Sequence, residues 1–232
     1  MRPAESAMQL LRRFVADAGH ELNTPIAIIE ASLEALTEIL RENNVKEELT
    51  EVIAKASARM GELASDLIFL AQVENPISHY VMGPVKTKKL LEDVTKDFQS
   101  LAKTRDIHFK LGAVADEEVI GNLEFLRRMV TNLGSNALRY TDEGGTVIIW
   151  SEVDGRDLAI KVSDTGIGIP DDSINHIFDR FYRVDKARAR AAGGAGLGLS
   201  IVKAVVDAHR GDISVSSEVG RGSTFKVRIP LA

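Results

Sequence analysis

The spacing of apolar residues over the first third of the chain places the strongest constraint on its fold. From Leu11 to Leu40 apolar side chains recur in alternating steps of three and four, and the same spacing returns from Leu49 to Leu70. This spacing is typical of amphipathic helices that carry a coiled-coil-like seam. The polar stretch RENN, residues 41–44, supplies a turn between the two runs. The sequence therefore predicts a hairpin of two long helices.

Two such helices alone leave much of each apolar seam uncovered. A second copy of the chain would cover both seams by forming a four-helix bundle, so we expect a homodimer. The alternative is a monomeric hairpin that docks on the rest of the chain. The dimer is favoured because both seams run the full length of their helices.

A change of pattern marks the end of the helical hairpin. The stretch NPISHYVMGP, residues 75–84, contains two prolines and a glycine and has no periodicity, which is typical of a linker. We therefore predict a first domain over residues 1–75, a linker over residues 76–85 and a second domain over residues 86–232.

The second domain mixes helical and strand patterns. KTKKLLEDVTKDFQSLAK and NLEFLRRMVTNLGSNALRY have helical periodicity, whereas TVIIWSEV, LAIKVSD and STFKVRI have the character of strands. Turns as short as DGRD and VGRG join successive strands, and such turns favour antiparallel pairing. We expect an α+β sandwich with a largely antiparallel mixed sheet and helices on one face.

Composition narrows the class of protein. Of 232 residues, 44% are hydrophobic and 27% charged, as in ordinary soluble globular proteins. The net charge of −5 argues against a nucleic-acid binder, and the absence of cysteine excludes disulfides and Cys-based metal sites. No apolar run reaches the length of about 18 residues that a membrane span needs, and the N-terminus lacks the features of a signal peptide. We expect a cytoplasmic location for this chain.

The stretch GHELNTPI, residues 19–26, places a histidine and a proline within the first predicted helix. Helical periodicity puts His20 away from the apolar seam, towards solvent, with Thr24 on the same face one turn along. Pro25 removes the N–H that would bond the carbonyl of Glu21, so the helix should bend there. A solvated surface histidine is the plain alternative, but it leaves the proline unexplained. We therefore interpret His20 as an exposed nucleophile on a bendable helix.

Three polar clusters in the second domain could serve a nucleotide. The first is NLGSNALRY, in which Asn132 and Asn136 stack on one helix face because they are four residues apart. With Arg139 nearby, the amide oxygens suit a hydrated Mg²⁺ ion and phosphates, since hard cations take oxygen ligands. Taken alone, this cluster is read more simply as a polar helix face.

The second cluster is DTGIGIP, which directly follows a predicted strand. Gly166 and Gly168 allow a sharp turn and a close approach of the backbone to a ligand. Asp164 is an acceptor suited to an exocyclic amine such as that of adenine. A plain glycine-rich turn is the alternative.

The third cluster is GGAGLGLS, residues 193–200, which opens a helix. Backbone N–H groups at such a helix start bind phosphate. The cluster is neither a Walker A loop nor a dinucleotide fingerprint. Before it lies RFYRVDKARAR, residues 180–190, a basic stretch that we interpret as a lid over a polyphosphate.

Together these segments resemble the cytoplasmic core of a sensor histidine kinase of a two-component system. FVADAGHELNTPI is similar to the family's H box, and the N, G1, F and G2 boxes are matched in the family's order by NLGSNALRY, DTGIGIP, IFDRFYRVD and GGAGLGLSI. The resemblance implies a dimerisation and histidine phosphotransfer domain, built as a dimeric four-helix bundle. It also implies a catalytic ATP-binding domain of the Bergerat (GHKL) type, the fold shared with gyrase, Hsp90 and MutL.

The resemblance also implies roles for individual residues. His20 would accept the γ-phosphoryl group, Glu21 would assist as base or orienter, and Thr24 would help to position water during dephosphorylation of a partner. ATP and Mg²⁺ are the implied cofactors, with Asn136 and Asn132 as the metal ligands. The implied ATP-binding residues are Asn132, Asn136, Arg139, Tyr140, Asp164, Gly166, Gly168, Ile169, Tyr182, Arg183, Gly194, Gly196, Leu197, Gly198 and Thr224.

The implied function is autophosphorylation of His20 followed by phosphotransfer to an aspartate of a response regulator, with dephosphorylation of that regulator as a further activity. The implied partners are a second copy of the chain and a receiver domain, with no nucleic acid. Membrane contact is expected only through a segment absent from this chain, which would anchor the full-length protein in the inner membrane.

Two rival functions are weighed against this one. A gyrase-type ATPase places a catalytic Glu four residues before the Mg²⁺-binding Asn, but here that position is Asn132, so no water-activating base is evident. A dimeric scaffold without catalytic activity is the second rival, and the five intact boxes argue against it.

Overall fold

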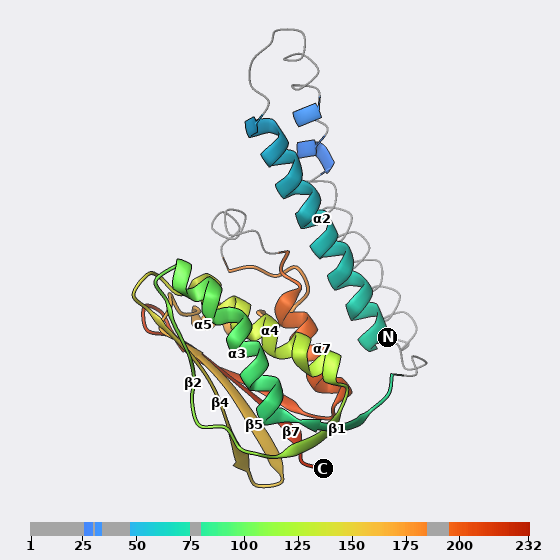
Figure 1. Cartoon of the computed structure of the whole chain (residues 1–232), viewed down its shortest axis with the longest axis vertical. Coiled ribbons are helices and arrows are strands. Elements are labelled where there is room, and N and C mark those ends of the chain that lie inside the picture. Colours follow the sequence, from blue (N-terminus) through green and yellow to red (C-terminus); the bar gives the residue numbers. More distant parts are fainter. Residues whose placement is uncertain (1–25, 30, 34–46, 75–79, 185–194) are drawn as a thin grey trace. The chain divides into compact units, whose positions relative to one another are not determined.

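The computed structural model describes residues 26–29, 31–33, 47–74, 80–184 and 195–232 (Figure 1). The chain divides into two compact units, residues 1–68 and residues 69–232. The division falls inside a helix, α2 (Glu47–Glu74).

The helix α2 corresponds to the second helix predicted from the apolar spacing. In its first-unit part, Ala56 and Leu63 are buried and lie seven residues apart on one face, as a heptad seam requires. The described residues of the first predicted helix, 26–29 and 31–33, are also helical. The turn predicted over residues 41–44 lies outside the described residues. Within the described part of the chain, no helix is both long enough and apolar enough to cross a membrane.

The second unit is the predicted α+β sandwich. Its elements, in chain order, are β1 (Gly83–Lys86), α3 (Thr87–Thr104), β2 (His108–Leu111), β3 (Glu118–Gly121), α4 (Leu123–Tyr140), β4 (Thr146–Asp154), β5 (Asp157–Asp164), α5 (Asp171–Ile174), α7 (Gly198–Ala208), β6 (Asp212–Glu218) and β7 (Gly222–Pro230). Among the described residues, one sheet has the strand order β2-β4-β5-β7-β6, and β1 and β3 form a separate antiparallel pair. Only the β2–β4 pairing in the larger sheet is parallel. The expectation of a mixed, largely antiparallel sheet is confirmed.

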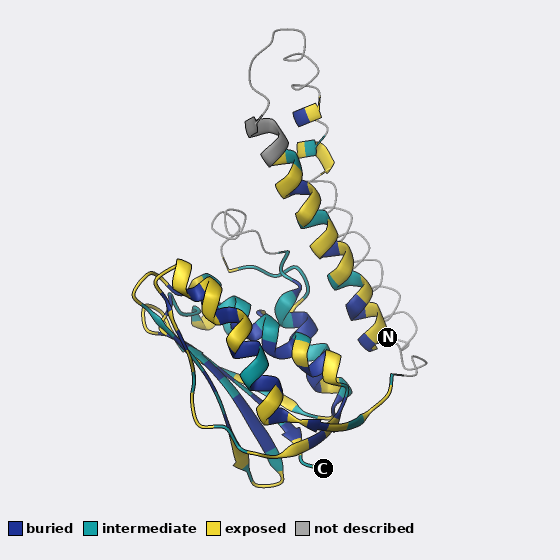
Figure 2. Ribbon diagram, in the orientation of Figure 1, coloured by how far each residue is buried: buried dark blue, intermediate teal, exposed yellow. Residues whose placement is uncertain are grey.

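The helices α3, α4 and α7 cover one face of the larger sheet (Figure 1). Side chains along a strand point alternately to the two faces, and β5 shows this, with Leu158, Ile160 and Val162 buried beneath the helices. The intervening Lys161 faces the open side together with Lys226 of β7, its cross-strand partner. Figure 2 shows buried residues both along the strands of this sheet and along the helices that cover it. The core of this unit therefore lies in one layer between sheet and helices.

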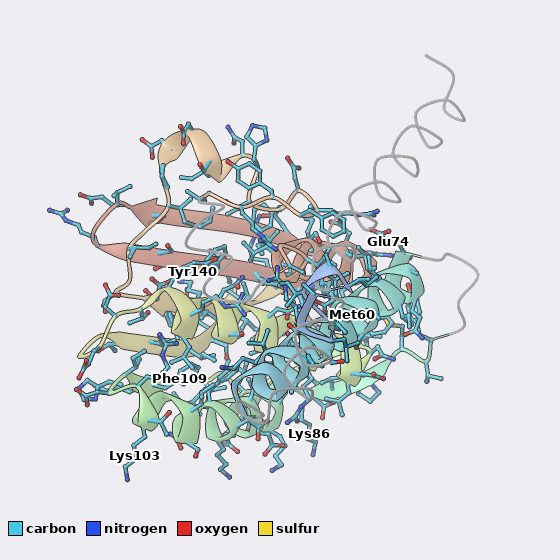
Figure 3. The ribbon with its side chains drawn as sticks, turned by 90° about the horizontal axis from the view of Figure 1, so that it is seen from above. Met60, Glu74, Lys86, Lys103, Phe109 and Tyr140 are labelled. Atoms are coloured by element: carbon cyan, nitrogen blue, oxygen red, sulfur yellow. The ribbon has the colours of Figure 1, made fainter. Side chains whose placement is uncertain are left out.

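The helices α3 and α4 lie side by side and run in the same direction. In Figure 3, Lys86 and Lys103 mark the ends of α3, and Tyr140 marks the end of α4 on the Lys103 side. The two helices approach closely at Gly134, where an added Cβ would lie 2.8 Å from the ring of Phe98. An alanine at this point would separate the helices.

The helix α7 packs on α4 in the opposite direction. At one end, the first residue of α7, Gly198, lies beside the middle of α4. At the other end, His209 is buried and its Nε2 accepts a hydrogen bond from the backbone N–H of Asn122 (3.1 Å), the residue that caps α4. Nδ1 of His209 donates to the carbonyl of Val205 (2.7 Å). The imidazole is therefore held neutral, and burial lowers the pKa of His209.

Candidate nucleotide-binding site

The carboxylate of Asp164 ends β5 in a buried position beside the start of the G1 turn. Its Oδ1 accepts hydrogen bonds from the backbone N–H groups of Gly166 (2.9 Å) and Ser223 (3.2 Å). Burial raises the pKa of the Asp164 carboxyl, and these two bonds oppose that shift. Within the described residues Oδ2 accepts no hydrogen bond, so one carboxylate oxygen is left to meet a ligand.

The turn after β5 depends on glycine at two positions because backbone passes close by. A Cβ on Gly166 would lie 2.2 Å from the carbonyl oxygen of Tyr140, and one on Gly168 would lie 2.1 Å from that of Glu218. Gly168 also has a φ of 71°, a conformation that favours glycine. The turn is sharp, as predicted, and both glycines pack against protein backbone; their predicted approach to a ligand stays a prediction.

The asparagines of α4 and the start of α7 come together, although they lie far apart in the sequence. The position of a Cβ on Gly198 is 3.9 Å from both Oδ1 of Asn132 and Nδ2 of Asn136. Nδ2 of Asn132 is buried and makes no hydrogen bond to any described residue. A buried amide without a partner is costly, so this donor is suited to a bound polar ligand.

The two residues that follow on α4 have different surroundings. Arg139 lines a hollow of about 290 Å³ between α3 and α4, together with Phe98, Leu101, Arg105, Ser135 and Leu138. Tyr140 is exposed, and its carbonyl accepts a hydrogen bond from the backbone N–H of Ile167 (3.2 Å). The G1 turn is therefore joined to the end of α4 through the backbone of Tyr140.

The F box and the G2 box meet at one point. The backbone N–H of Phe181 donates to the carbonyl of Gly196 (2.9 Å), and both residues have positive φ, 61° and 78°. A Cβ on Gly196 would lie 2.8 Å from the carbonyl carbon of Phe181, so this contact requires glycine. The ends of the segment from Tyr182 to residue 195 are thus held together by backbone.

The remaining expected residues are Tyr182, Arg183, Leu197 and Ile169. Tyr182 places its ring 5.5 Å from the ring of His176, and Arg183 is half-buried. Leu197 is buried and precedes the first residue of α7. The backbone N–H of Ile169 donates to Oγ of Ser217 (2.8 Å).

The structure does not bring Thr224 together with Asp164. Thr224 lies on the open face of the sheet, where its Oγ1 bonds Oγ of Ser163 (2.8 Å). The residue opposite Asp164 on the helix-covered face is Ser223, which the sequence reasoning missed. Strand alternation could have found it, because Ser223 is two residues from the apolar Phe225 and therefore shares its face.

Four expected site residues lie outside the described residues: His20, Glu21, Thr24 and Gly194. Among the others, two groups of residues come together. Asn132, Asn136 and Gly198 meet where α7 begins beside α4, and Asp164, Gly166 and Tyr140 meet at the end of β5. Thr224 lies on the open face and Arg139 lines the hollow between α3 and α4. The described residues hold no cluster of three or more His, Cys, Asp or Glu side chains that could bind a metal ion.

Two protein families match the chain. Residues 10–76 match the His Kinase A (phospho-acceptor) domain, and residues 121–232 match the family described as histidine kinase-, DNA gyrase B- and HSP90-like ATPases. The first match covers the predicted helical hairpin, and the second covers the α+β sandwich from Gly121 on.

Curated relatives are identical to this chain at about a third of the aligned positions. The sensor histidine kinase RppB of Synechocystis is 35% identical over 233 residues, which cover 100% of this chain and 51% of RppB. The phosphate regulon sensor protein PhoR of Pseudomonas aeruginosa is 36% identical over 220 residues, covering 94% of this chain and 49% of PhoR. The chain thus spans about half the length of the relatives that it matches.

Solved structures have the same fold. The histidine kinase AdeS of Acinetobacter baumannii superposes with a TM-score of 0.74 at 25% identity, covering 91% of this chain and 98% of that one. The histidine kinase ThkA, solved in complex with the response regulator protein TrrA, gives a TM-score of 0.77 at 22% identity, over 100% of this chain and 65% of that one. The second likeness concerns the fold alone.

Proposed function

Because the chain belongs to the sensor histidine kinases of two-component systems, we propose that it binds ATP in its second unit and transfers the γ-phosphoryl group to His20. The observation that carries the proposal is the meeting of Asn132, Asn136 and Gly198, where Nδ2 of Asn132 is buried and has no hydrogen-bond partner among the described residues. Such a constellation is costly unless a polar ligand completes it.

Different residues of the proposed site would bind the base, the Mg²⁺ ion and the phosphates. Asp164 presents its free Oδ2 to the exocyclic amine of adenine. The amide oxygens of Asn132 and Asn136 would hold Mg²⁺, which offsets negative charge on the phosphates when it is bound. The backbone N–H groups at the start of α7, from Gly198 on, would bind phosphate oxygens, as at other helix N-termini.

His20 acts as the nucleophile in the proposed reaction. Its neutral imidazole nitrogen attacks the γ-phosphorus, the bond to the β–γ bridging oxygen breaks, and ADP leaves. Glu21 orients the ring or takes its proton. In a second step, a carboxylate oxygen of the receiver aspartate attacks the phosphorus and the bond to histidine breaks.

A second copy and a response regulator are the proposed partners. Several apolar side chains of the described helical segments are exposed in a single chain: Ile26, Ile28, Leu33, Val52 and Ile68. Burial of such side chains favours association of two hairpins into a bundle. The complex of ThkA with a response regulator protein supports a receiver domain as the acceptor. By analogy with the family, we also propose that a segment outside this chain anchors the protein in the inner membrane. We further propose that Thr24 assists dephosphorylation of the regulator.

Labelling with γ-phosphate-labelled ATP and Mg²⁺ tests the proposal. The wild-type protein should gain a label that is stable in base and labile in acid, as a phosphohistidine is. His20→Gln should gain none, while it keeps its affinity for ATP, because His20 lies in a different domain from the ATP site. A label that survives in His20→Gln would contradict the proposed acceptor.

Asn136→Asp provides a second arm of the same experiment. It should abolish labelling in a protein that retains an intact His20, since the site would then hold an extra negative charge next to the phosphates. Hydrolysis of ATP without any protein label would instead support a gyrase-type ATPase.

A further inference from the structure

The strands β5, β7 and β6 place one residue each in a row on the helix-covered face of the sheet. Asp164 lies opposite Ser223, and Ser223 lies opposite Ser217. Asp164 and Ser223 are buried and Ser217 is half-buried. Neither serine is among the residues that the family resemblance implies. We refer to Asp164, Ser223 and Ser217 as the acceptor row.

The hydroxyl of Ser217 is surrounded by three polar groups. Its Oγ accepts a hydrogen bond from the backbone N–H of Ile169 (2.8 Å) and donates one to the carbonyl of Gly222 (3.0 Å). It also lies 2.9 Å from Oγ of Ser223. A serine hydroxyl has one proton to donate and two lone pairs with which to accept.

Counting protons decides the direction of the bond between the two serines. A carbonyl oxygen only accepts, so the single proton of Ser217 is committed to Gly222. All three contacts then hold together only if Ser223 donates its proton to Ser217. The hydroxyl of Ser217 is completed by one bond donated and two accepted.

The proton of Ser223 therefore points along the row, towards Ser217, and its oxygen offers only lone pairs to the site. The neighbouring Asp164 is a carboxylate and offers only acceptors as well. An adenine base presents an exocyclic amine, which donates, whereas a 6-oxo purine presents a carbonyl, which accepts. A 6-oxo group placed against the row would find no donor, and unpaired polar groups in a binding site are strongly rejected.

We propose that Ser217 is a positioning residue that sets the base specificity of the nucleotide site: it takes up the proton of Ser223 and so keeps the acceptor row free of donors. Ser217 acts through Ser223, and the inference rests on the proposed binding of ATP. Removing the Ser217 hydroxyl frees the proton of Ser223 to turn towards a 6-oxo group. Tolerance of 6-oxo purines should then increase.

The test measures Kd for ATP and for inosine triphosphate by titration calorimetry, with Mg²⁺ present. Inosine triphosphate carries a 6-oxo group in place of the 6-amino group. In Ser217→Ala, the ratio of the inosine to the adenine Kd should fall by about fivefold, the size of one net hydrogen bond. Ser217→Thr keeps a hydroxyl and should keep the wild-type ratio.

Ser216→Ala is the matched control, since Ser216 lies next to Ser217 on the same strand but is exposed on the open face. Its ratio should equal that of the wild type. The double variant Ser217→Ala, Ser223→Ala has no hydroxyl left to turn, so its ratio should return towards the wild-type value. If Ser217→Ala does not fold, Ser217→Cys carries the same expectation, because a thiol is a weak donor and acceptor.

An unchanged ratio in Ser217→Ala, even with weaker binding of both nucleotides, would overturn the inference and leave Ser217 as a support for the G1 turn alone. That result would not touch the proposed function, which stands on ATP binding and on labelling of His20 in the wild type. A wild type that binds neither nucleotide would overturn both.

Discussion

Two neighbouring rows of residues cross the same three strands, β5, β7 and β6, but lie on opposite faces of the sheet. The acceptor row, Asp164–Ser223–Ser217, lies beneath the helices, whereas Ser163, Thr224 and Ser216 form the adjacent row on the open face. Both rows contain a bond between two hydroxyls, 2.9 Å in the first and 2.8 Å in the second. In the covered row that bond directs a proton beside a carboxylate, and in the open row it competes with water. The face of the sheet, more than the chemistry of the side chain, decides which hydroxyls can recognise a ligand.

The largest contrast is expected at the carboxylate. Asp164→Asn keeps the acceptor for Gly166 and Ser223 on one side but turns an NH₂ group towards the amine of adenine. The affinity for ATP should fall by about 100-fold, since a hydrogen bond to a charged group is lost and a repulsive contact replaces it. Titration calorimetry measures this. Ser163→Ala, one residue away on the open face, should leave the affinity unchanged, and a comparable loss there would contradict the comparison.

The turn that brings β6 to β7 offers a second contrast, in stability. A Cβ on Gly222 would lie 2.0 Å from the carbonyl oxygen of Asp164, whereas one on Gly220 meets nothing within 4 Å. Both have positive φ, so Gly220→Ala should cost about 1 kcal/mol of unfolding free energy. Gly222→Ala adds a backbone clash and should cost about 3 kcal/mol. Urea unfolding of the two variants measures both losses of unfolding free energy. Equal losses would mean that the backbone at Asp164 can move away from the added Cβ.

The hydroxyls themselves provide a smaller effect. Ser223→Ala should weaken ATP binding by about fivefold, because an oxygen that faces the site is removed. Thr224→Ala removes a hydroxyl bonded to Ser163 on the other face and should change ATP affinity by less than about twofold. A competition assay with a fluorescent ATP analogue resolves these values. A larger loss in Thr224→Ala would restore that residue to the site.

The smallest expected effect is on stability at acid pH, at His209, where the end of α7 meets the start of α4. The folded pKa of His209 is lowered by burial, so the unfolded chain takes up its proton first as the pH falls. The stabilising contribution is complete above the unfolded pKa of about 6.5 and is lost progressively below it. The unfolding free energy of the wild type should therefore fall as the pH is lowered below about 6.5. In His209→Gln the dependence on pH should be flatter. His108→Gln, at an exposed site, is the control and should keep the wild-type slope.

Much of the second unit could be predicted from the sequence because its signals are local. The helical periodicity of KTKKLLEDVTKDFQSLAK and NLEFLRRMVTNLGSNALRY corresponds to α3 and α4, and the glycines after β5 do make a sharp turn. The separate pairing of β1 with β3 was not predicted, since the partner of a short strand is set by tertiary packing.

The site was predictable in its residue types and less so in its geometry. Strand alternation places Ser223 on the covered face, but its position opposite Asp164 depends on the register between strands. Register depends on turns that a sequence shows only in outline. The hollow that Arg139 lines lies between α3 and α4, and such a packing detail has no local signal. Helix pattern alone places Arg139 on a stripe but does not say which neighbour that stripe meets.

The bond between Phe181 and Gly196 has a consequence for engineering. A segment whose two ends are clasped by backbone can be lengthened at little entropic cost, because the cost of closing a loop grows only slowly with its length. A fluorescent peptide or a small tag inserted between those ends should therefore leave the sheet and its helices folded. The hydrogen bond between Phe181 and Gly196 therefore makes this segment a suitable insertion site for a reporter.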